Sequence, residues 1–168
     1  AAGTGNPFFT TDTFTDWNGN PATETTYFDA TGTKLGSSNT NTSTWTDWNG
    51  NTITSTNTNY NGASGSWLGS EWSESNGNSG WNTSAIESIT FDFDGDAATA
   101  DTTQTVQVER GENTRTWTDP NNQTQTEIST YEHYYTTDNS WTFLGGQETR
   151  NGETTKWDAN WNTIGMSV

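Results

Sequence analysis

Residues 40–58 read TNTSTWTDWNGNTITSTNT, and this stretch indicates an all-β chain. Residues 40–46 and 52–58 both alternate at a period of two, which is the spacing of a half-buried strand. Asn49-Gly50 lies between the two runs. Asn-Gly in this position is the strongest short-range signal of a β-hairpin, because both residues of the expected turn adopt a positive φ. The stretch therefore predicts two antiparallel strands joined by a tight turn.

The same signals recur along the chain. Asn-Gly pairs stand at Asn18-Gly19, Asn76-Gly77 and Asn151-Gly152, and residues 102–108 and 124–131 are further alternating runs. Residues 83–87 are the one segment for which a helical turn is considered. The sequence therefore predicts hairpins throughout and almost no helix.

Tryptophans mark a repeat. Trp45, Trp81 and Trp117 are 36 residues apart and Trp157 follows 40 later, with an aspartate turn after three of the four. A period of this length is typical of stacked supersecondary units. We expect an N-terminal segment (1–13) and one repeat-built β domain (14–168), with units at about 14–44, 45–80, 81–116 and 117–156 and a closing segment at 157–168.

The predicted fold is an antiparallel meander of four hairpin repeats that forms a stacked-sheet, sandwich-like domain, with a propeller-like arrangement as the alternative. A large apolar residue at a fixed repeat position normally packs inside. We therefore expect Trp45, Trp81, Trp117 and Trp157 to form the core of the repeats.

The composition restricts the partners. The formal net charge is -16, the sequence pI is about 4.1, and the chain has no cysteine. Such acidity argues against binding nucleic acid or anionic membranes, which reward lysine and arginine, and no apolar run is long enough for membrane insertion. The chain favours cations, neutral glycans or copies of itself. Richness in Thr, Asn and Gly without cysteine is typical of a secreted bacterial protein at the cell surface.

Two segments resemble a known group of repeats. Residues 27–36 read YFDATGTKLG, which is similar to the tyrosine-aspartate repeats of bacterial surface proteins. Residues 157–162 read WDANWN and resemble repeats of large secreted, calcium-dependent bacterial proteins. The resemblance implies an extracellular adhesin or matrix protein, often loaded with calcium.

The best candidate metal site lies in residues 92–101. Asp92 and Asp94 point the same way at strand period, while Phe91 and Phe93 face the core, and Gly95 allows a turn that returns Asp96 toward them. Ca²⁺ prefers several carboxylate and carbonyl oxygens. We therefore expect Asp92, Asp94, Asp96 and Asp101 either to bind calcium or to form a solvated hairpin tip.

Other tryptophans suggest a second kind of site. Exposed aromatic residues tend to mark interaction surfaces, and tryptophan rings stack on sugar rings. A glycan-binding role is therefore the alternative function, in which the chain is the carbohydrate-binding module of an adhesin. The candidate residues for this role are Trp17, Trp48, Trp72 and Trp161.

The leading function is structural or adhesive. Natural sheet edges are usually blunted by Lys or Pro, and this chain has few of either. We expect assembly into filaments or a biofilm matrix by strand addition, through the N-terminal segment with Phe8 and Phe9, and calcium is the candidate cation that assists it. Thr-x-Thr rows add ice binding as a minor alternative. The chain lacks the motifs of an enzyme, and His133 has no catalytic partner at a recognisable spacing.

Overall fold

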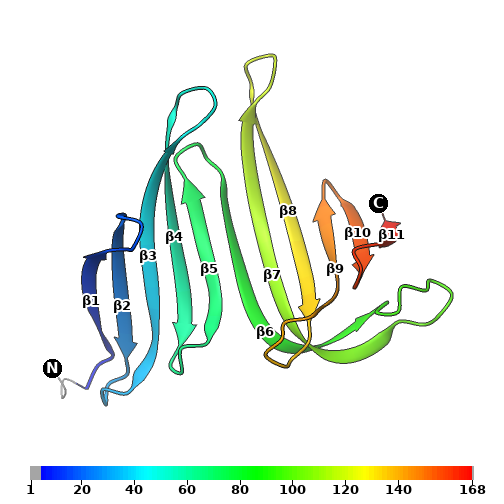
Figure 1. Cartoon of the computed structure of the whole chain (residues 1–168), viewed down its shortest axis with the longest axis horizontal. Coiled ribbons are helices and arrows are strands. Elements are labelled where there is room, and N and C mark those ends of the chain that lie inside the picture. The colour runs from blue at the N-terminus through cyan, green and yellow to red at the C-terminus, as the bar shows by residue number, and fades with distance from the viewer. Residues whose placement is uncertain (1–4, 168) are drawn as a thin grey trace. The chain divides into compact units, whose positions relative to one another are not determined.

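A computed structural model describes residues 5–167 of the chain, and this part is all-β (Figure 1). The strands follow one another in one antiparallel sheet whose spatial order is the sequence order, and this sheet is not closed. Its strands are β1 (Phe8–Thr15), β2 (Pro21–Phe28), β3 (Lys34–Thr46), β4 (Thr52–Gly62), β5 (Trp67–Glu74), β6 (Ser79–Phe91), β7 (Thr102–Thr118), β8 (Thr124–Tyr135), β9 (Phe143–Arg150), β10 (Glu153–Asp158) and β11 (Thr163–Ser167). The predicted all-β antiparallel meander is confirmed.

Three finer expectations are corrected. The described residues lie in one sheet rather than in two stacked sheets, and its strand order is linear rather than the ring of a propeller. The segment considered for a helical turn, residues 83–87, lies inside β6. The chain divides into two compact units, Ala1–Ser79 and Gly80–Val168, each considered by itself below.

One turn design closes most of the hairpins. In the β3–β4 turn, the Asp47 N–H donates to the Asn51 carbonyl at 2.9 Å and the Gly50 N–H donates to the Asp47 carbonyl at 3.0 Å. Asp47 Oδ1 accepts the N–H groups of Asn49 and Asn51, at 2.9 and 2.8 Å. One carboxylate oxygen therefore holds the turn closed using atoms of the turn alone.

The same arrangement recurs. Backbone bonds of this pattern close seven turns, which begin at Asp16, Asp29, Asp47, Gly62, Glu74, Asp119 and Asp158. In the five that begin with aspartate, Oδ1 accepts the N–H groups of the residues two and four places later. The fourth residue always has a positive φ, at Gly19, Gly32, Gly50, Gly65, Gly77, Asn122 and Trp161.

The turn type differs from the sequence-based expectation at three of the four Asn-Gly pairs. A single positive φ, at the glycine, is found in the described turns at Asn18-Gly19, Asn49-Gly50 and Asn76-Gly77. This is a type I turn followed by a left-handed residue in a bulge, a common longer hairpin connection. Asn151-Gly152 has positive φ at both residues, 53° and 79°, and is the expected two-residue turn. At Asn18-Gly19 and Asn49-Gly50 the leading aspartate carboxylate stabilises the longer loop, whereas the turn at Asn76-Gly77 begins with Glu74 and has the same backbone bonds without that carboxylate acceptor.

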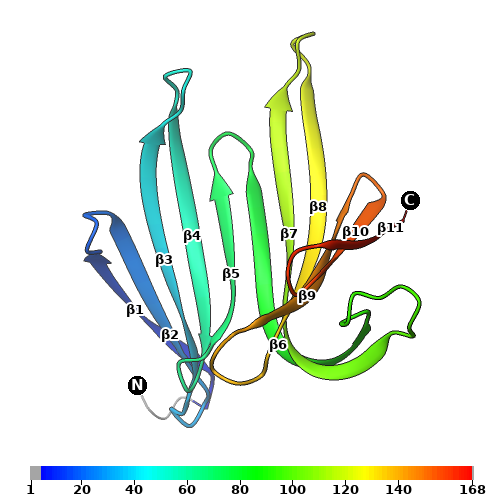
Figure 2. The same cartoon turned by 45° about the vertical axis from the view of Figure 1, so that its right-hand side comes forward.

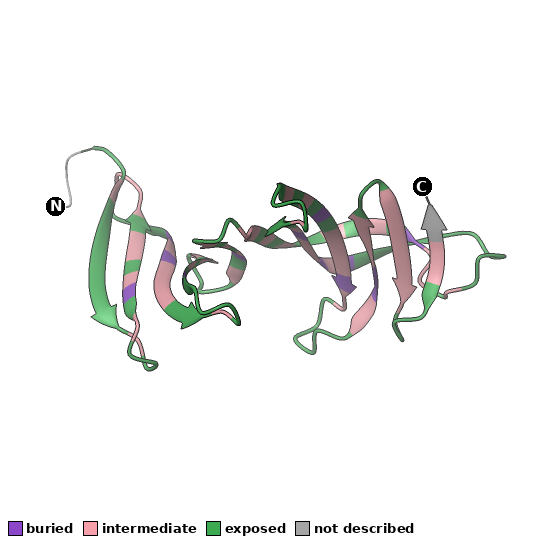
Figure 3. Cartoon of the chain, turned by 90° about the horizontal axis from the view of Figure 1, so that it is seen from above, coloured by how far each residue is buried: buried purple, intermediate pink, exposed green. Residues whose placement is uncertain are grey.

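The first unit has little core. In its described part, Ala22 and Ile53 are the buried hydrophobic residues, at 6% and 5% exposure. Figure 3 shows exposed and half-buried segments along its strands. Backbone ladders and cross-strand pairs therefore hold this unit together.

Threonines share one face of the first unit. The pairing register aligns Thr13, Thr23, Thr40 and Thr58 across β1 to β4, with further threonine pairs in the rows beside them. The Thr40 and Thr58 hydroxyls lie 2.8 Å apart and those of Thr11 and Thr25 lie 3.4 Å apart. Strand alternation brings them together because threonine stands at every second position.

The second unit contains the hydrophobic core. Phe91, Val106, Val108 and Tyr134 are 3% exposed or less, and Ile89, Phe93, Leu144 and Ile164 pack against them. Tyr134 meets the rings of Phe91 and Phe93 edge to face, at centroid distances of 5.0 and 5.9 Å. The predicted inward orientation of Phe91 and Phe93 is confirmed.

A charged network continues from this core. The Tyr134 hydroxyl donates to Glu132 at 2.7 Å, and the Arg110 guanidinium donates to Glu132 at 2.8 Å and to Glu87 at 3.0 and 3.1 Å. Burial opposes ionisation of Glu132, but the hydrogen bonds from Tyr134 and Arg110 outweigh it and hold the pKa of that carboxyl below its ordinary value. The network ties β6, β7 and β8 together.

The marker tryptophans are not the core. Trp45, Trp81 and Trp117 are 44%, 42% and 40% exposed, Trp157 is half-buried, and the buried cluster does not contain them. The assignment of Trp45, Trp81, Trp117 and Trp157 as core residues is therefore wrong. A fixed position in the repeat determines on which face of the sheet a side chain lies. It does not bury that side chain where the face is open to solvent.

The aspartate turn gives a first prediction. Asp47→Ala removes the acceptor of two backbone N–H groups, so the variant should unfold at a lower temperature than the parent. Asp47→Asn keeps an acceptor oxygen, so its unfolding temperature should fall less than that of Asp47→Ala. Asp12→Ala, the same change at an exposed strand position opposite Glu24, is the control and should melt no lower than the parent in thermal melts followed by circular dichroism. Equal melting temperatures for Asp47→Ala and Asp12→Ala would contradict the turn's role.

Acid should weaken the same turns. The pKa values of Asp29, Asp47, Asp119 and Asp158 lie below their ordinary values. The first cause is the Thr31 hydroxyl for Asp29, and the N–H four residues later for the other three. As the pH falls, these aspartates are protonated in the unfolded chain before they are protonated in the folded chain. Their contribution to stability is therefore complete above the ordinary aspartate pKa of about 3.9, and it is lost as the pH falls through the lowered pKa values of the folded state.

Protonation also relieves the general repulsion within a chain of net charge -16. This effect is common to the parent and to a single-residue variant, so the measurement compares the two proteins. Between about pH 5 and pH 2, urea unfolding of the parent should lose more stability than that of Asp119→Asn, whose amide does not titrate. Identical pH profiles for the two proteins would show that the carboxylate of Asp119 does not stabilise the fold.

Candidate functional site

The first candidate is the open edge formed by β1. This strand reads FFTTDTFT, contains one charged residue and has neither lysine nor proline. It pairs with β2 on one side, Phe8 opposite Phe28 and Phe9 opposite Tyr27. Because β1 ends the strand order, the backbone groups on its other side have no strand partner within the described residues.

The N-terminal expectation changes accordingly. Residues 8–13, predicted as part of an N-terminal segment that pairs with another copy, belong to β1 of the chain's own sheet, so the boundary at residue 13 falls inside a strand. Phe8 stacks on Phe28 at a centroid distance of 4.9 Å, whereas Phe9 is 66% exposed. Residues 1–4 lie outside the described residues.

The opposite end of the strand order is β11. It reads TIGMS, is uncharged, and pairs with β10 along Thr154–Trp157, with a bulge between Lys156 and Trp157. Figure 2 shows β9, β10 and β11, in orange to red, as the last strands of the chain. Both ends of the strand order therefore carry short, nearly uncharged strands.

Two of the predicted glycan-binding tryptophans project from turns of the first unit. Trp17 and Trp48 each follow the aspartate of a turn, and each is 93% exposed. The β1–β2 and β3–β4 turns that carry them close at the same end of the strands (Figure 1). Trp72 differs, because it lies half-buried in β5 opposite Asn57. Trp161 belongs to the second unit.

The acidic loop between β6 and β7 is organised by its own hydrogen bonds. Asp94 accepts the Asp96 N–H at 3.0 Å and the Thr99 hydroxyl at 2.8 Å. Asp96 accepts the Ala98 N–H at 2.9 Å. The Asp94 and Asp96 carboxylates therefore stabilise the loop through hydrogen bonds within it, a role that their spacing in the sequence did not predict.

Asp92 has a different environment. Its Oδ1 is inaccessible to solvent and has no hydrogen-bond partner within the described residues. Desolvation, together with the neighbouring Asp94 carboxyl, raises the pKa of Asp92. Throughout residues 5–167, no three His, Cys, Asp or Glu side chains are arranged to hold a metal ion. Asp92, Asp94, Asp96 and Asp101 are therefore not gathered into a calcium cage, and calcium binding stays a prediction.

A polar hollow of about 260 Å³ lies on one face of the second unit. Trp81, Arg110, Glu132 and Gln147 contribute to its lining, with threonines of β8, β9 and β10. Arg110 is already neutralised by Glu87 and Glu132. The hollow therefore offers hydrogen-bonding groups beside an indole ring rather than a free charge.

The other face of the same unit has an aromatic cluster that sequence reasoning missed. It comprises Tyr131, His133, Tyr135, Trp141, Phe143, Trp157 and Trp161. The signal available in the sequence was the i, i+2 spacing of Tyr131, His133 and Tyr135 on β8. The contact of His133 with Trp161, at 5.5 Å, depends on the pairing of three strands.

No family model, no curated protein and no solved structure matches the chain. The described residues contain no helix long and apolar enough to span a membrane. The functional argument therefore rests on the open edges, the exposed tryptophans and the two faces of the sheet.

Proposed function

We propose that the protein is an extracellular structural or adhesive β-repeat protein that assembles through its sheet edges. The observation that supports this most is the open sheet, which ends in β1 on one side and β11 on the other. An edge strand that has neither lysine nor proline leaves its unpaired backbone groups open for pairing with another chain, and neither β1 nor β11 contains either residue.

Edge pairing supplies affinity through backbone hydrogen bonds, and the side chains at alternate positions supply selectivity. If β11 of one copy pairs with β1 of the next, the contact is head-to-tail and does not close, so it produces filaments. Pairing of β1 with β1 of a second copy would stop at a dimer. The size of the assembly therefore identifies the edge that is used.

Charge opposes this assembly. Each copy has a formal net charge of -16, so neighbouring copies repel one another unless salt or bound cations screen them. Calcium is the cation that the secreted setting and the acidic composition suggest. Growth that needs only ionic strength would leave calcium without a specific role.

The assembly is tested by placing positive charge on the edge. Thr11→Lys with Thr13→Lys puts two lysines on β1, and both threonines are exposed. The matched control is Thr44→Lys with Thr46→Lys, the same spacing and charge change at exposed positions of the inner strand β3. Sedimentation and negative-stain imaging, with calcium and with chelator, should show polymers for the parent and the control and none for the edge variant. Polymers of unchanged length in the edge variant, or a monomeric parent, would refute the proposal.

A carbohydrate-binding module is the second candidate, favoured by the 93% exposure of Trp17 and Trp48. An indole that contacts little of its own protein can stack on a sugar ring. Trp17→Ala with Trp48→Ala should abolish retention on a neutral glycan resin and change the free energy of unfolding by no more than about 0.5 kcal/mol, as expected for exposed positions. Unchanged retention would exclude these turns as the glycan site.

A further inference from the structure

The aromatic cluster defined above forms a continuous surface on one face of the second unit, here called the aromatic face. The register places Tyr131, Glu148 and Thr155 in one row across β8, β9 and β10, and His133, Gly146 and Trp157 in the next. Tyr135 and Phe143 pair beyond them. Strand rise of about 3.3 Å per residue makes this surface roughly 20 Å long from Tyr135 to Ser129.

Glycines make room for its rings. A Cβ added at Gly111 would lie 2.5 Å from the Tyr131 ring, and one at Gly146 would lie 3.0 Å from His133 Cδ2 and 2.7 Å from the Glu132 carbonyl oxygen. Tyr131 and His133 therefore lie flat over bare backbone instead of standing up from the sheet. Burial lowers the pKa of His133, which favours a neutral ring among the other aromatic residues.

Two tryptophans of this face have an unusual backbone. Trp141 and Trp161 have φ of 52° and 62°, a left-handed conformation that is a genuine outlier for a bulky side chain. Trp161 occupies the fourth position of the turn that begins at Asp158, where the other turns of this design have glycine or asparagine. A bulky residue held in this conformation suggests a functional requirement for the ring.

The exposed rings are available to a ligand. Trp161 stacks on Phe143 at 4.1 Å with an interplanar angle of 7°, and it is still 54% exposed. Trp141 is 45% exposed. One face of the Trp161 ring packs on the protein, and a large part of the side chain meets solvent.

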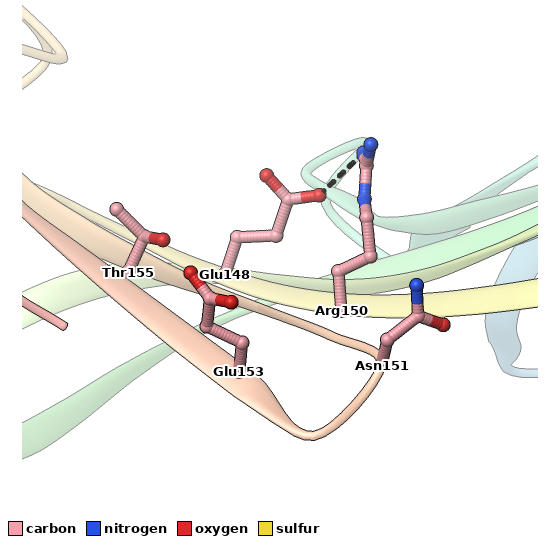
Figure 4. A pocket seen from close by; sticks show the side chains of 5 residues that line it. All are labelled: Glu148, Arg150, Asn151, Glu153 and Thr155. Atoms are coloured by element: carbon pink, nitrogen blue, oxygen red, sulfur yellow. Dashed lines mark hydrogen bonds and ion pairs between the residues drawn. The ribbon is translucent and has the colours of Figure 1, made fainter. Parts of the chain in front are cut away.

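An acidic hollow of about 340 Å³ continues the same face, lined by Glu148, Arg150, Asn151, Glu153 and Thr155 (Figure 4). Arg150 pairs with Glu148 at 2.9 Å and with Glu127 at 3.5 Å. Glu153 has no ion pair or side-chain hydrogen bond within the described residues. Glu148 and Glu127 thus share the one guanidinium and Glu153 has no cationic partner in the described part of the chain, which leaves an excess of negative charge beside the rings.

We propose that the aromatic face and the acidic hollow together bind a polysaccharide chain whose sugars carry free amino groups. The C–H faces of the sugars stack on Trp161 and its neighbours, because the negative faces of aromatic rings attract C–H groups and cations. The ammonium groups pair with Glu153 and Glu148. Acidic polysaccharides are excluded by the same charge.

A peptide fits this surface less well. Extended peptides are captured at free sheet edges and helical peptides in apolar grooves. The strands beneath the aromatic face, β8, β9 and β10, are paired on both sides, so they have no free backbone for an added strand. Flat sugar rings need no such bonds.

The test titrates the full chain with a short glucosamine oligosaccharide, its N-acetylated form and a neutral glucose oligosaccharide. Calorimetry and tryptophan fluorescence report binding. The parent should bind the glucosamine oligosaccharide at least about tenfold more tightly than the other two, which corresponds to about 1.4 kcal/mol, and added salt should weaken this binding. No binding of the glucosamine oligosaccharide, or equal binding of all three, would overturn the proposal.

Two variants locate the site. Trp161→Asn removes the ring, and asparagine is tolerated there because Asn122 has the same φ of 62° at the same turn position. Glu153→Gln removes the unpaired charge. Each should weaken glucosamine binding at least about tenfold, which corresponds to about 1.4 kcal/mol, and Trp161→Asn should keep the circular dichroism spectrum of the parent.

The control is Trp81→Ala, a comparably exposed tryptophan in the polar hollow on the opposite face. It should bind the oligosaccharide as the parent does. Loss of binding in Trp81→Ala with retention in Trp161→Asn would place the glycan on the other face and refute the inference.

Assembly and sugar binding can fail separately. Trp161→Asn and Glu153→Gln should still polymerise, and the β1 lysine variant should still bind sugar, so the failure of one proposal is distinguishable from the failure of the other.

Discussion

A carboxylate oxygen that accepts two backbone N–H groups stabilises five of the hairpin turns of this protein. In the turn at Asp47, the acceptor and both donors lie within five consecutive residues, so the turn closes without help from the rest of the chain. The fourth residue must then adopt a positive φ, which glycine and asparagine do at little cost. Because each turn is self-contained, the chain can add strand after strand by local pairing, as repeat proteins do.

Local turns permit a fold with very little interior. In the first unit the strands are joined by backbone ladders and threonine pairs, and few of the described apolar residues are buried. The second unit adds one compact cluster around Tyr134, and the Glu132 carboxylate links that cluster to Arg110. Both faces of such a sheet are available for interactions, so function is expected on faces and edges rather than in a deep cleft.

The two units use their faces differently. One face of the first unit presents rows of threonine hydroxyls that bond to one another, as Thr40 does with Thr58. One face of the second unit presents seven aromatic rings beside an acidic hollow, with Trp141 and Trp161 held in a backbone conformation that bulky residues avoid. Local strain of this kind persists when surrounding contacts enforce it, and here the Phe143 ring stacked on Trp161 is such a contact.

The sequence by itself determined the strands, the positions of the turns and the all-β class, because alternation and the Asp-x-x-Gly pattern act over a few residues. It did not determine which side chains are buried. The 36-residue spacing of Trp45, Trp81 and Trp117 suggested a core, but these side chains are 40–44% exposed, because a fixed repeat position does not by itself place a residue where the sheet is covered. Only the tertiary structure decided that Asp94 anchors a turn, that residues 8–13 join an edge strand, and that His133 meets Trp161. These contacts depend on pairing register and on loop geometry, which arise when separate strands are laid side by side.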